Sequence, residues 1–180
     1  METKVAAVSM KNVTKTFGSV VANEKVDLDI YKGEILALLG ENGSGKTTLM
    51  NMLAGIYYPD EGQIFINGKE EVIKTPKDAL NLGIGMVHQE FSLIPGFTAT
   101  ENILLNREPQ KKNVISEVFG SRLNTLDYKE MDRSAAAAIE KMGVHIDANM
   151  VISDMPVGHK QFTEIARELS KEHLKLLILD

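Results

Sequence analysis

The stretch Gly40–Thr47, GENGSGKT, decides the fold, because it fits the pattern G-x-x-x-x-G-K-[ST] of a phosphate-binding loop. Its glycines let the backbone wrap so that successive N–H groups point inward at an anion. Lys46 can reach the β- and γ-phosphates of a nucleotide, and Thr47 can ligate magnesium. The apolar run EILALL before the loop predicts a buried strand, and the helical spacing after it predicts a helix whose positive end faces the phosphates.

Antiparallel strands are predicted on both sides of this strand–loop–helix unit. VDLDI alternates apolar and charged residues, Lys32-Gly33 turns the chain, and residues 34–39 form the buried strand. After the loop, a helix over residues 46–56 is indicated by four apolar residues on one face, namely Leu49, Met52, Leu53 and Ile56. Asn67-Gly68 lies between two alternating segments, which favours a β-hairpin.

The second half of the chain is predicted to be mainly helical. A short helix opens at Thr75-Pro76 and closes at Gly83, and the apolar run IGMVHQ follows as a strand. Thr100 is expected to cap a helix over ENILLNRE, and residues 107–125 form a loop or variable helix. Two longer helices follow, residues 127–142 with Met131, Ala135, Ile139 and Met142 on one face, and residues 158–171 with Phe162, Ile165, Ala166 and Leu169 on one face.

LKLLILD, residues 174–180, is an apolar run that ends on a carboxylate. It predicts a strand buried on both faces, of the kind found inside parallel sheets. Asp180 then lies at the carboxyl end of that strand, where open α/β sheets place their ligands.

Composition limits the class of protein. With 180 residues, 43% of them hydrophobic, the chain can form one domain with a real core and a smaller lobe attached. Its formal net charge of -5 argues against nucleic acid as a partner. It contains no cysteine, which fits a reducing compartment, and no apolar run near 18 residues, so any link to a membrane is expected through a partner.

The sequence around the loop resembles the ATP-binding subunits of ATP-binding cassette (ABC) transporters from about Lys11 to Asp180, and is most similar to importers of simple sugars and of nucleosides. The resemblance implies an α/β fold: a P-loop NTPase core with an antiparallel β subdomain and an α-helical subdomain. It implies a β subdomain and core over residues 1–98, a helical subdomain over 99–157, and a return to the core over 158–180.

The resemblance also implies the roles of single residues. Phe17 stands where the family places the aromatic ring that stacks on adenine. Lys46 and Gln89 are expected to be catalytic, and Thr47, Gln89 and Asp180 to hold Mg²⁺, with Asp180 as the Walker B carboxylate. The residues expected to bind ATP are Phe17, Gly40, Glu41, Asn42, Gly43, Ser44, Gly45, Lys46, Thr47 and Thr48.

The signature motif departs from the family pattern L-S-G-G-Q. Here the same positions read Met155, Pro156, Val157, Gly158 and His159. Pro156 has neither a hydroxyl nor an N–H, and Val157 adds bulk where glycine allows close approach to the γ-phosphate held by the opposite cassette. We expect this motif to support hydrolysis poorly at the partner's site, which would make the transporter asymmetric. The alternative is that the helix dipole and Gly158 suffice.

Family residues that follow the Walker B Asp, a glutamate that polarises water and a switch histidine, are missing from these 180 residues. We therefore expect this form to bind ATP without hydrolysing it efficiently, and to be marginally stable. The expected function is the ATP-binding subunit of a sugar importer at the cytoplasmic face of the membrane. Its expected partners are a second cassette, fused or dimeric, membrane permease subunits and, indirectly, an extracytoplasmic substrate-binding protein. A nucleoside importer, a soluble non-transport ABC ATPase and a non-catalytic nucleotide-binding or dimerisation fragment remain alternatives.

Overall fold

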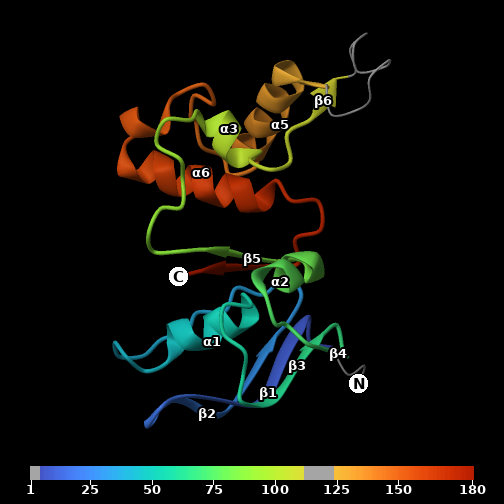
Figure 1. Ribbon diagram of the computed structural model, residues 1–180, viewed down its shortest axis with the longest axis vertical. Coiled ribbons are helices and arrows are strands. Elements are labelled where there is room, and N and C mark those ends of the chain that lie inside the picture. Colours follow the sequence, from blue (N-terminus) through green and yellow to red (C-terminus); the bar gives the residue numbers. More distant parts are fainter. Residues whose placement is uncertain (1–4, 112–123) are drawn as a thin grey trace. The chain divides into compact units, whose positions relative to one another are not determined.

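The computed structural model describes residues 5–111 and 124–180 (Figure 1). The chain divides into two compact units. The first unit comprises Met1–Met86 and His173–Asp180, and the second unit comprises Val87–Glu172. The predicted division at residues 98 and 157 stays a prediction.

Each unit has its own set of helices and strands. The first contains β1 (Val8–Phe17), β2 (Val20–Ile30), α1 (Lys46–Leu53), β3 (Glu61–Ile66), β4 (Lys69–Glu71), α2 (Pro76–Leu82), β5 (Ile84–Val87, whose last residue belongs to the second unit) and β8 (Leu176–Leu179). The second contains α3 (Ala99–Ile103), β6 (Gln110–Lys111), β7 (Thr125–Leu126), α5 (Tyr128–Glu140), the 3-10 helix η2 (Ile152–Asp154) and α6 (Val157–Leu169).

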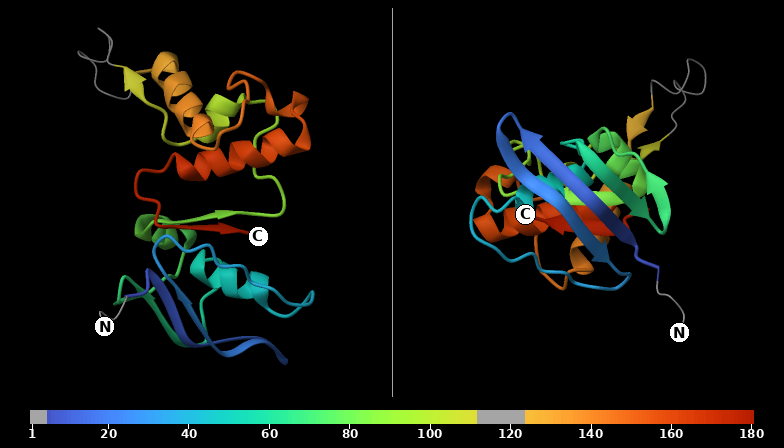
Figure 2. Two further views of the ribbon diagram at one scale, coloured as in Figure 1. Left: turned by 180° about the vertical axis from the view of Figure 1, so that it is seen from behind. Right: turned by 90° about the horizontal axis from the view of Figure 1, so that it is seen from below.

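An antiparallel sheet of order β2-β1-β3-β4 forms one layer of the first unit (Figure 2). Val8 of β1 pairs with Ile30 of β2 on one side and with Ile66 of β3 on the other. The β3–β4 hairpin turns at Asn67 and Gly68, whose φ angles of 51° and 80° suit a two-residue hairpin turn. The predicted hairpin is therefore confirmed, whereas β1 was not predicted from sequence patterns.

Helix α1 contributes to the same core as the sheet. Leu49, Met52 and Leu53 are buried in one cluster with inward-facing residues of β1 and β3. The predicted helical face is confirmed for these three residues. It is wrong for Ile56, which lies beyond the end of α1 and is exposed. Helix α2 has the predicted start and end, with the Thr75 side chain accepting from Asp78 N and Gly83 at the C-cap.

The predicted strand over residues 34–39 is wrong. These residues belong to no helix or strand, and Ile35 and Leu39 are 99% and 91% exposed. The physical reason is the lack of a partner: no strand in the described part of the chain pairs with this segment. A strand needs a neighbour to satisfy its backbone groups, so an apolar run alone does not form one.

The predicted strand at the end of the chain does form, as β8, and pairs with β5. Gly83 O accepts hydrogen bonds from Lys175 N at 2.7 Å and from Leu176 N at 3.1 Å. Burial on both faces is wrong, because Ile178 is buried but Leu179 is exposed. Within residues 5–111 and 124–180, β8 has a strand on one side only, and this explains its partial exposure.

The core of the second unit lies among α3, α5 and α6. Ile103, Met131, Ile139 and Ala166 are buried in it. The predicted helix after Asp127 is confirmed as α5, with Asp127 as its N-cap. The predicted cap at Thr100 is wrong. Thr98 caps α3, since its side chain accepts from Glu101 N, and Thr100 is an interior residue of the helix.

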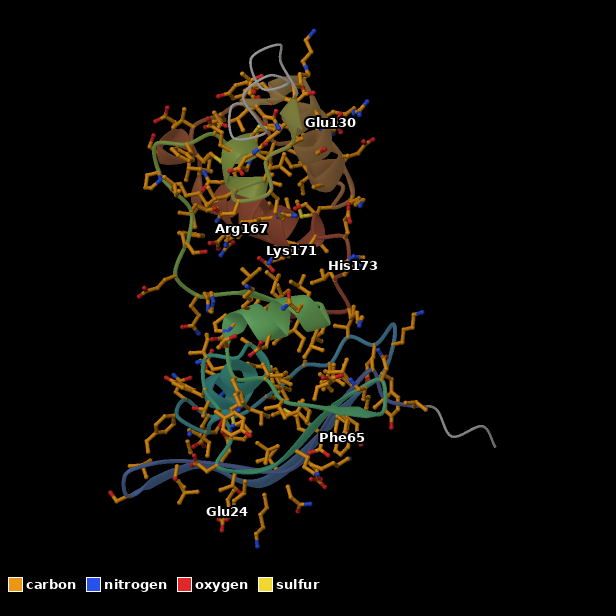
Figure 3. All side chains as sticks on the ribbon, turned by 45° about the vertical axis from the view of Figure 1, so that its right-hand side comes forward. Glu24, Phe65, Glu130, Arg167, Lys171 and His173 are labelled. Atoms are coloured by element: carbon orange, nitrogen blue, oxygen red, sulfur yellow. The ribbon has the colours of Figure 1, made fainter. Side chains whose placement is uncertain are left out.

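Helix α6 confirms the predicted helix near residues 158–171 but not its whole predicted face. Ala166 is buried, whereas Phe162 is 37% exposed. Glu164 and Glu168 are buried instead, next to Arg167, which Figure 3 labels on this helix. A helical pattern indicates buried positions by their hydrophobicity, and a carboxylate that is buried with hydrogen-bond partners gives no such signal.

The predicted loop over residues 107–125 lies largely outside the described residues. Its described ends pair as β6 and β7, with Gln110 opposite Leu126. Across residues 5–111 and 124–180, no helix is both long enough and apolar enough to cross a membrane.

Candidate nucleotide-binding site

Close packing against β2 shapes the end of the phosphate-binding loop. Gly45 is the N-cap of α1 with φ +84°, and an added Cβ would lie 2.2 Å from Ala22 O. Only glycine fits this position, because both the positive φ and the contact exclude a side chain. Asn23 Nδ2 donates to Gly45 O at 3.2 Å and ties the loop to the strand.

Asn23 is a residue of this site that sequence patterns do not predict. It is buried, and its Oδ1 has no hydrogen-bond partner among the described residues. Its sequence signal was weak, since one polar residue in an otherwise alternating strand is common. The contact with the phosphate-binding loop depends on how β2 and α1 pack.

The ammonium group of Lys46 lies inside the curve of the loop. Its Nζ donates to Gly40 O at 2.9 Å, Glu41 O at 2.8 Å and Ser44 Oγ at 3.3 Å. The first turn of α1, KTTL, carries no acidic side chain, so the positive end of the helix dipole is not neutralised locally. A concentrated positive charge of this kind suits a phosphate group.

Tertiary structure brings Thr47 and Asp180 together. Thr47 Oγ1 donates to Asp180 Oδ1 at 3.1 Å, although the two residues are 133 positions apart. Hydroxyl and carboxylate oxygens are ligands that Mg²⁺ prefers, and they stand beside the phosphate-binding loop. The side chains present therefore fit a nucleotide with its magnesium ion.

Phe17 ends β1 with its ring partly exposed. The ring meets Tyr57 edge to face, with ring centroids 5.1 Å apart and an interplanar angle of 72°. Lys15 Nζ lies 5.6 Å from the Phe17 centroid. Tyr57 was not predicted as a neighbour. Tyr57 and Lys15 therefore both contact the Phe17 ring, which remains 43% exposed.

Two predicted groups of site residues belong to the second unit. Gln89 lies two residues beyond β5, in a segment without regular structure, and is exposed. Pro156 is the N-cap of α6, and no side chain among the described residues caps this helix.

The first turn of α6 carries the rest of the signature. Val157 is 63% exposed, and a Cβ on Gly158 would meet no described atom within 4 Å. His159 Nδ1 is buried, without a hydrogen-bond partner among the described residues.

The loop, the helix that starts at its lysine and the Thr47–Asp180 contact define the class of phosphate-binding-loop proteins. Residues 23–180 match the family model described as ABC transporter, and the chain therefore belongs to the ABC transporter family.

Two curated relatives and one solved structure illustrate the match. The chain is 39% identical over 171 residues to the ribose import ATP-binding protein of Caldanaerobacter subterraneus subsp. tengcongensis, covering 95% of this chain and 32% of the relative. It is 46% identical over 162 residues to the nucleoside import ATP-binding protein of Lactococcus lactis subsp. cremoris, covering 90% and 30%. A dimeric bacterial ABC transporter cassette is 26% identical with a TM-score of 0.74, covering 96% and 73%. The chain thus spans about a third of the length of these curated relatives.

Proposed function

We propose that this chain is the nucleotide-binding part of the ATP-binding subunit of an ABC importer, which couples binding and hydrolysis of ATP to uptake of a simple sugar. The observation that carries the proposal is the hydrogen bond between Thr47 and Asp180 beside the phosphate-binding loop. It joins two oxygen ligands of the type that magnesium needs at the place where Lys46 concentrates positive charge.

Each part of the site has a role in this proposal. The backbone of Gly40–Thr48 and the Lys46 ammonium hold the β- and γ-phosphates, while Phe17 stacks on adenine. Thr47 and Asp180 hold the magnesium ion, together with Gln89. When bound, magnesium neutralises charge that develops on the transferring phosphoryl group. Lys46 and Gln89 are the residues of this chain to which we assign catalysis.

The descriptions of the relatives support the proposed partners. A solved cassette of the same fold is described as dimeric, which supports a second cassette as the partner, fused or separate. The relatives are described as import proteins, which supports association with membrane permease subunits at the cytoplasmic face and, indirectly, with a substrate-binding protein outside the membrane.

Binding of magnesium-ATP tests the proposal directly. Titration calorimetry on the chain should detect Mg-ATP, and Lys46→Ala should weaken binding at least tenfold because the phosphate charge loses its partner. Asp180→Asn should weaken binding in the presence of magnesium and have little effect in its absence. Lys32→Ala, in an exposed turn, is the matched control for loss of a positive charge. Equal affinities of Lys46→Ala and Lys32→Ala would refute the assignment of the site.

A nucleoside is the second candidate cargo, because the relative with 46% identity is a nucleoside importer. We favour a sugar, since several of the matched relatives are described as ribose importers. The complete transporter in vesicles should take up labelled ribose, and an unlabelled nucleoside should not compete. Uptake of the nucleoside alone would reverse the preference.

The variant signature is part of the proposal. Pro156 at the N-cap and exposed Val157 replace the hydroxyl and the small residue that the family pattern places at the start of this helix. In the complete transporter, the double change Pro156→Ser and Val157→Gly should raise ATP turnover, because it adds a hydroxyl donor and removes bulk at the γ-phosphate. Unchanged turnover would contradict the proposed asymmetry.

A further inference from the structure

Helix α6 buries two carboxylates in the second unit. Glu164 is 1% exposed and Glu168 is 4% exposed. A buried carboxylate is costly unless it is paired and hydrogen-bonded. The partners of these two side chains therefore indicate what the burial achieves.

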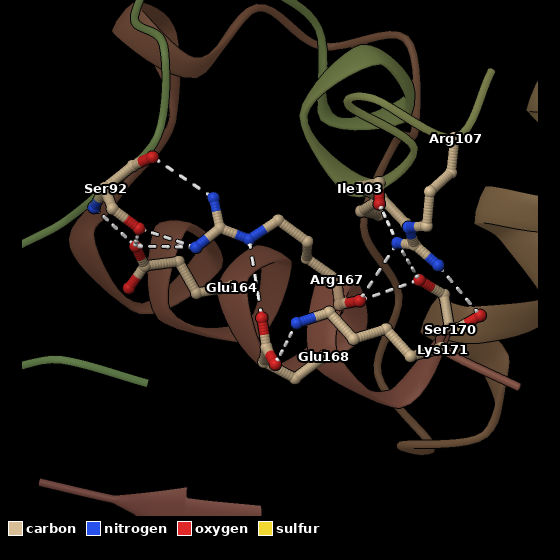
Figure 4. Close-up of polar contacts among 8 residues, drawn as sticks. All are labelled: Ser92, Ile103, Arg107, Glu164, Arg167, Glu168, Ser170 and Lys171. Atoms are coloured by element: carbon tan, nitrogen blue, oxygen red, sulfur yellow. Dashed lines mark hydrogen bonds and ion pairs between the residues drawn. The ribbon is translucent and has the colours of Figure 1, made fainter. Parts of the chain in front are cut away.

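The partner of Glu164 is Ser92, three residues after Gln89. Glu164 Oε1 accepts from Ser92 N at 2.5 Å and from Ser92 Oγ at 3.1 Å. Arg167, one turn further along α6, donates from Nη1 to Ser92 O at 3.1 Å and from Nη2 to Ser92 Oγ at 2.5 Å. Figure 4 shows that every polar atom of Ser92 is bound to α6. We call this cluster of Ser92, Glu164 and Arg167 the Ser92 anchor.

The Arg167 side chain is itself held in place. Its Nη2 lies 3.9 Å from Glu164 Oε1, and its Nε lies 3.9 Å from Glu168 Oε1 (Figure 4). Lys171 forms an ion pair with Glu168 on the other side. Alternating charges along one helix face thus hold the guanidinium group in the orientation that reaches Ser92 with two donors.

Asn102 of α3 binds the chain at a second point, Ile94, two residues after Ser92. The fully buried Asn102 accepts from Ile94 N at 2.7 Å and donates to Ile94 O at 3.1 Å and Thr98 O at 3.0 Å. Residues 92–98 are therefore bound to the helices of the second unit at two points. Residues 88–91, in contrast, are all exposed and lie outside helices and strands.

Arg107 contacts the C-terminal end of α6. It donates to Ile103 O at 2.7 Å and to Ser170 O at 3.1 Å, and so joins the end of α3 to the end of α6 (Figure 4). Its partial burial lowers the pKa of the guanidinium group from its usual value. The Ser92 anchor and Arg107 both contact the C-terminal half of α6, so they join this half of the helix to Ser92 and to the end of α3.

We infer that Glu164 and Arg167 are positioning residues that fix the chain just after Gln89 to the helix that starts at the signature. A displacement of α6 then moves Ser92 with it, and residues 88–91, which are exposed and lie outside helices and strands, take up the change. This inference rests on the proposed function, because it gives Gln89 a mechanical link to Val157–His159. Hydrogen bonds within the second unit join α6 to Ser92, and the backbone of residues 90 and 91 joins Ser92 to Gln89.

Hydrogen exchange of the Ser92 amide in the 180-residue chain tests the anchor without nucleotide. Glu164→Ala should raise its exchange rate at least tenfold, because the N–H loses its acceptor. Glu164→Gln keeps an acceptor oxygen and should stay within about threefold of the unmodified chain. Glu140→Ala, an exposed glutamate on α5, is the matched control and should have no effect. Unchanged exchange of Ser92 in Glu164→Ala would overturn the inference.

Arg167→Lys separates positioning from general stability. Lysine keeps the charge but lacks the two separate nitrogens with which Arg167 reaches both Ser92 O and Ser92 Oγ, so exchange should rise at residues 92–94 and not in α5. An equal loss of protection throughout α5 would show that the residue only stabilises the unit, and would refute a positioning role.

The same variants separate the anchor from the proposed function. With Mg-ATP bound, the 180-residue chain should change its exchange at residues 88–94 and at residues 157–160 together. Glu164→Ala should bind Mg-ATP within about twofold of the unmodified chain but lose this joint change. If the joint change persists in Glu164→Ala, the inference is wrong. If the unmodified chain does not bind Mg-ATP, the proposed function is wrong, and exchange of Ser92 without nucleotide still decides on the anchor.

Discussion

Asp60 shows how a single exposed residue can connect two elements. Its carboxylate accepts from Lys15 Nζ at 2.7 Å, from Thr16 N at 2.7 Å and from Thr16 Oγ1 at 2.8 Å. The Lys15 ammonium, followed by the Thr16 backbone and hydroxyl, lowers the pKa of the Asp60 carboxyl from 3.8 to about 2. These contacts join the residue before β3 to the end of β1, next to Phe17.

The lowered pKa of Asp60 predicts a dependence of stability on pH. The folded pKa lies below the unfolded value, so the carboxylate stabilises the fold above about pH 3.8, and this contribution is lost as the pH falls through about 2. Asp60→Asn should therefore be less stable than the unmodified chain at pH 5, and the difference should shrink toward pH 2. Urea unfolding midpoints across that range measure it.

Glu24 provides the control for this measurement. It is exposed on β2 in the same sheet, and Figure 3 labels its position. Glu24→Gln removes a carboxylate without removing the contacts of Asp60. The lowered pKa of Asp60 would be contradicted if the urea midpoints of Asp60→Asn and the unmodified chain differed by a constant amount from pH 5 to pH 2.

Elements with strong local signals agreed with the sequence predictions. Thr75-Pro76 starts α2, and Asn67-Gly68 turns the β3–β4 hairpin, because a few neighbouring residues determine the backbone angles there. Thr98 rather than Thr100 caps α3, so the predicted start of this helix was wrong by two residues. Either threonine can accept a backbone N–H, so only the position at which the chain enters the helix distinguishes them.

Elements whose structure depends on distant partners were predicted less well. Residues 34–39 have the composition of a buried strand but no partner strand among the described residues, and Ile35 is almost fully exposed. Helix α6 has the predicted position, but Glu164 is buried on it because Ser92 comes from a distant loop. In both cases the apolar pattern is local, whereas the partner that decides burial is not.

The whole molecule contains two separate hydrophobic cores. The core of the first unit includes Met52, and that of the second unit includes Met131. Met52→Ala and Met131→Ala should each lower the free energy of unfolding by about 2–5 kcal/mol, because each leaves a cavity. Each change should weaken protection from hydrogen exchange in urea mainly in its own unit.

Binding of Mg-ATP provides a second test of whether the two units unfold separately. A ligand that binds the phosphate-binding loop should raise the stability of the first unit by about 2.7 kcal/mol at a concentration of 100 times its Kd. The same exchange measurement in urea follows both units when it is read separately for residues 5–86 with 173–180 and for residues 87–111 with 124–172. If each substitution and the ligand change protection from hydrogen exchange equally in both ranges, the two units do not unfold separately.

Local sequence patterns are enough to predict the phosphate-binding loop, the turns and the helices around it, because these depend on residues close together in the chain. They also indicate Asp180 as a carboxylate at a strand end. The contacts of Asp180 with Thr47, of Asn23 with Gly45 and of Ser92 with α6 become visible only in the folded chain. These contacts join residues that are 22 to 133 positions apart, and packing between elements, not local patterns, determines such contacts.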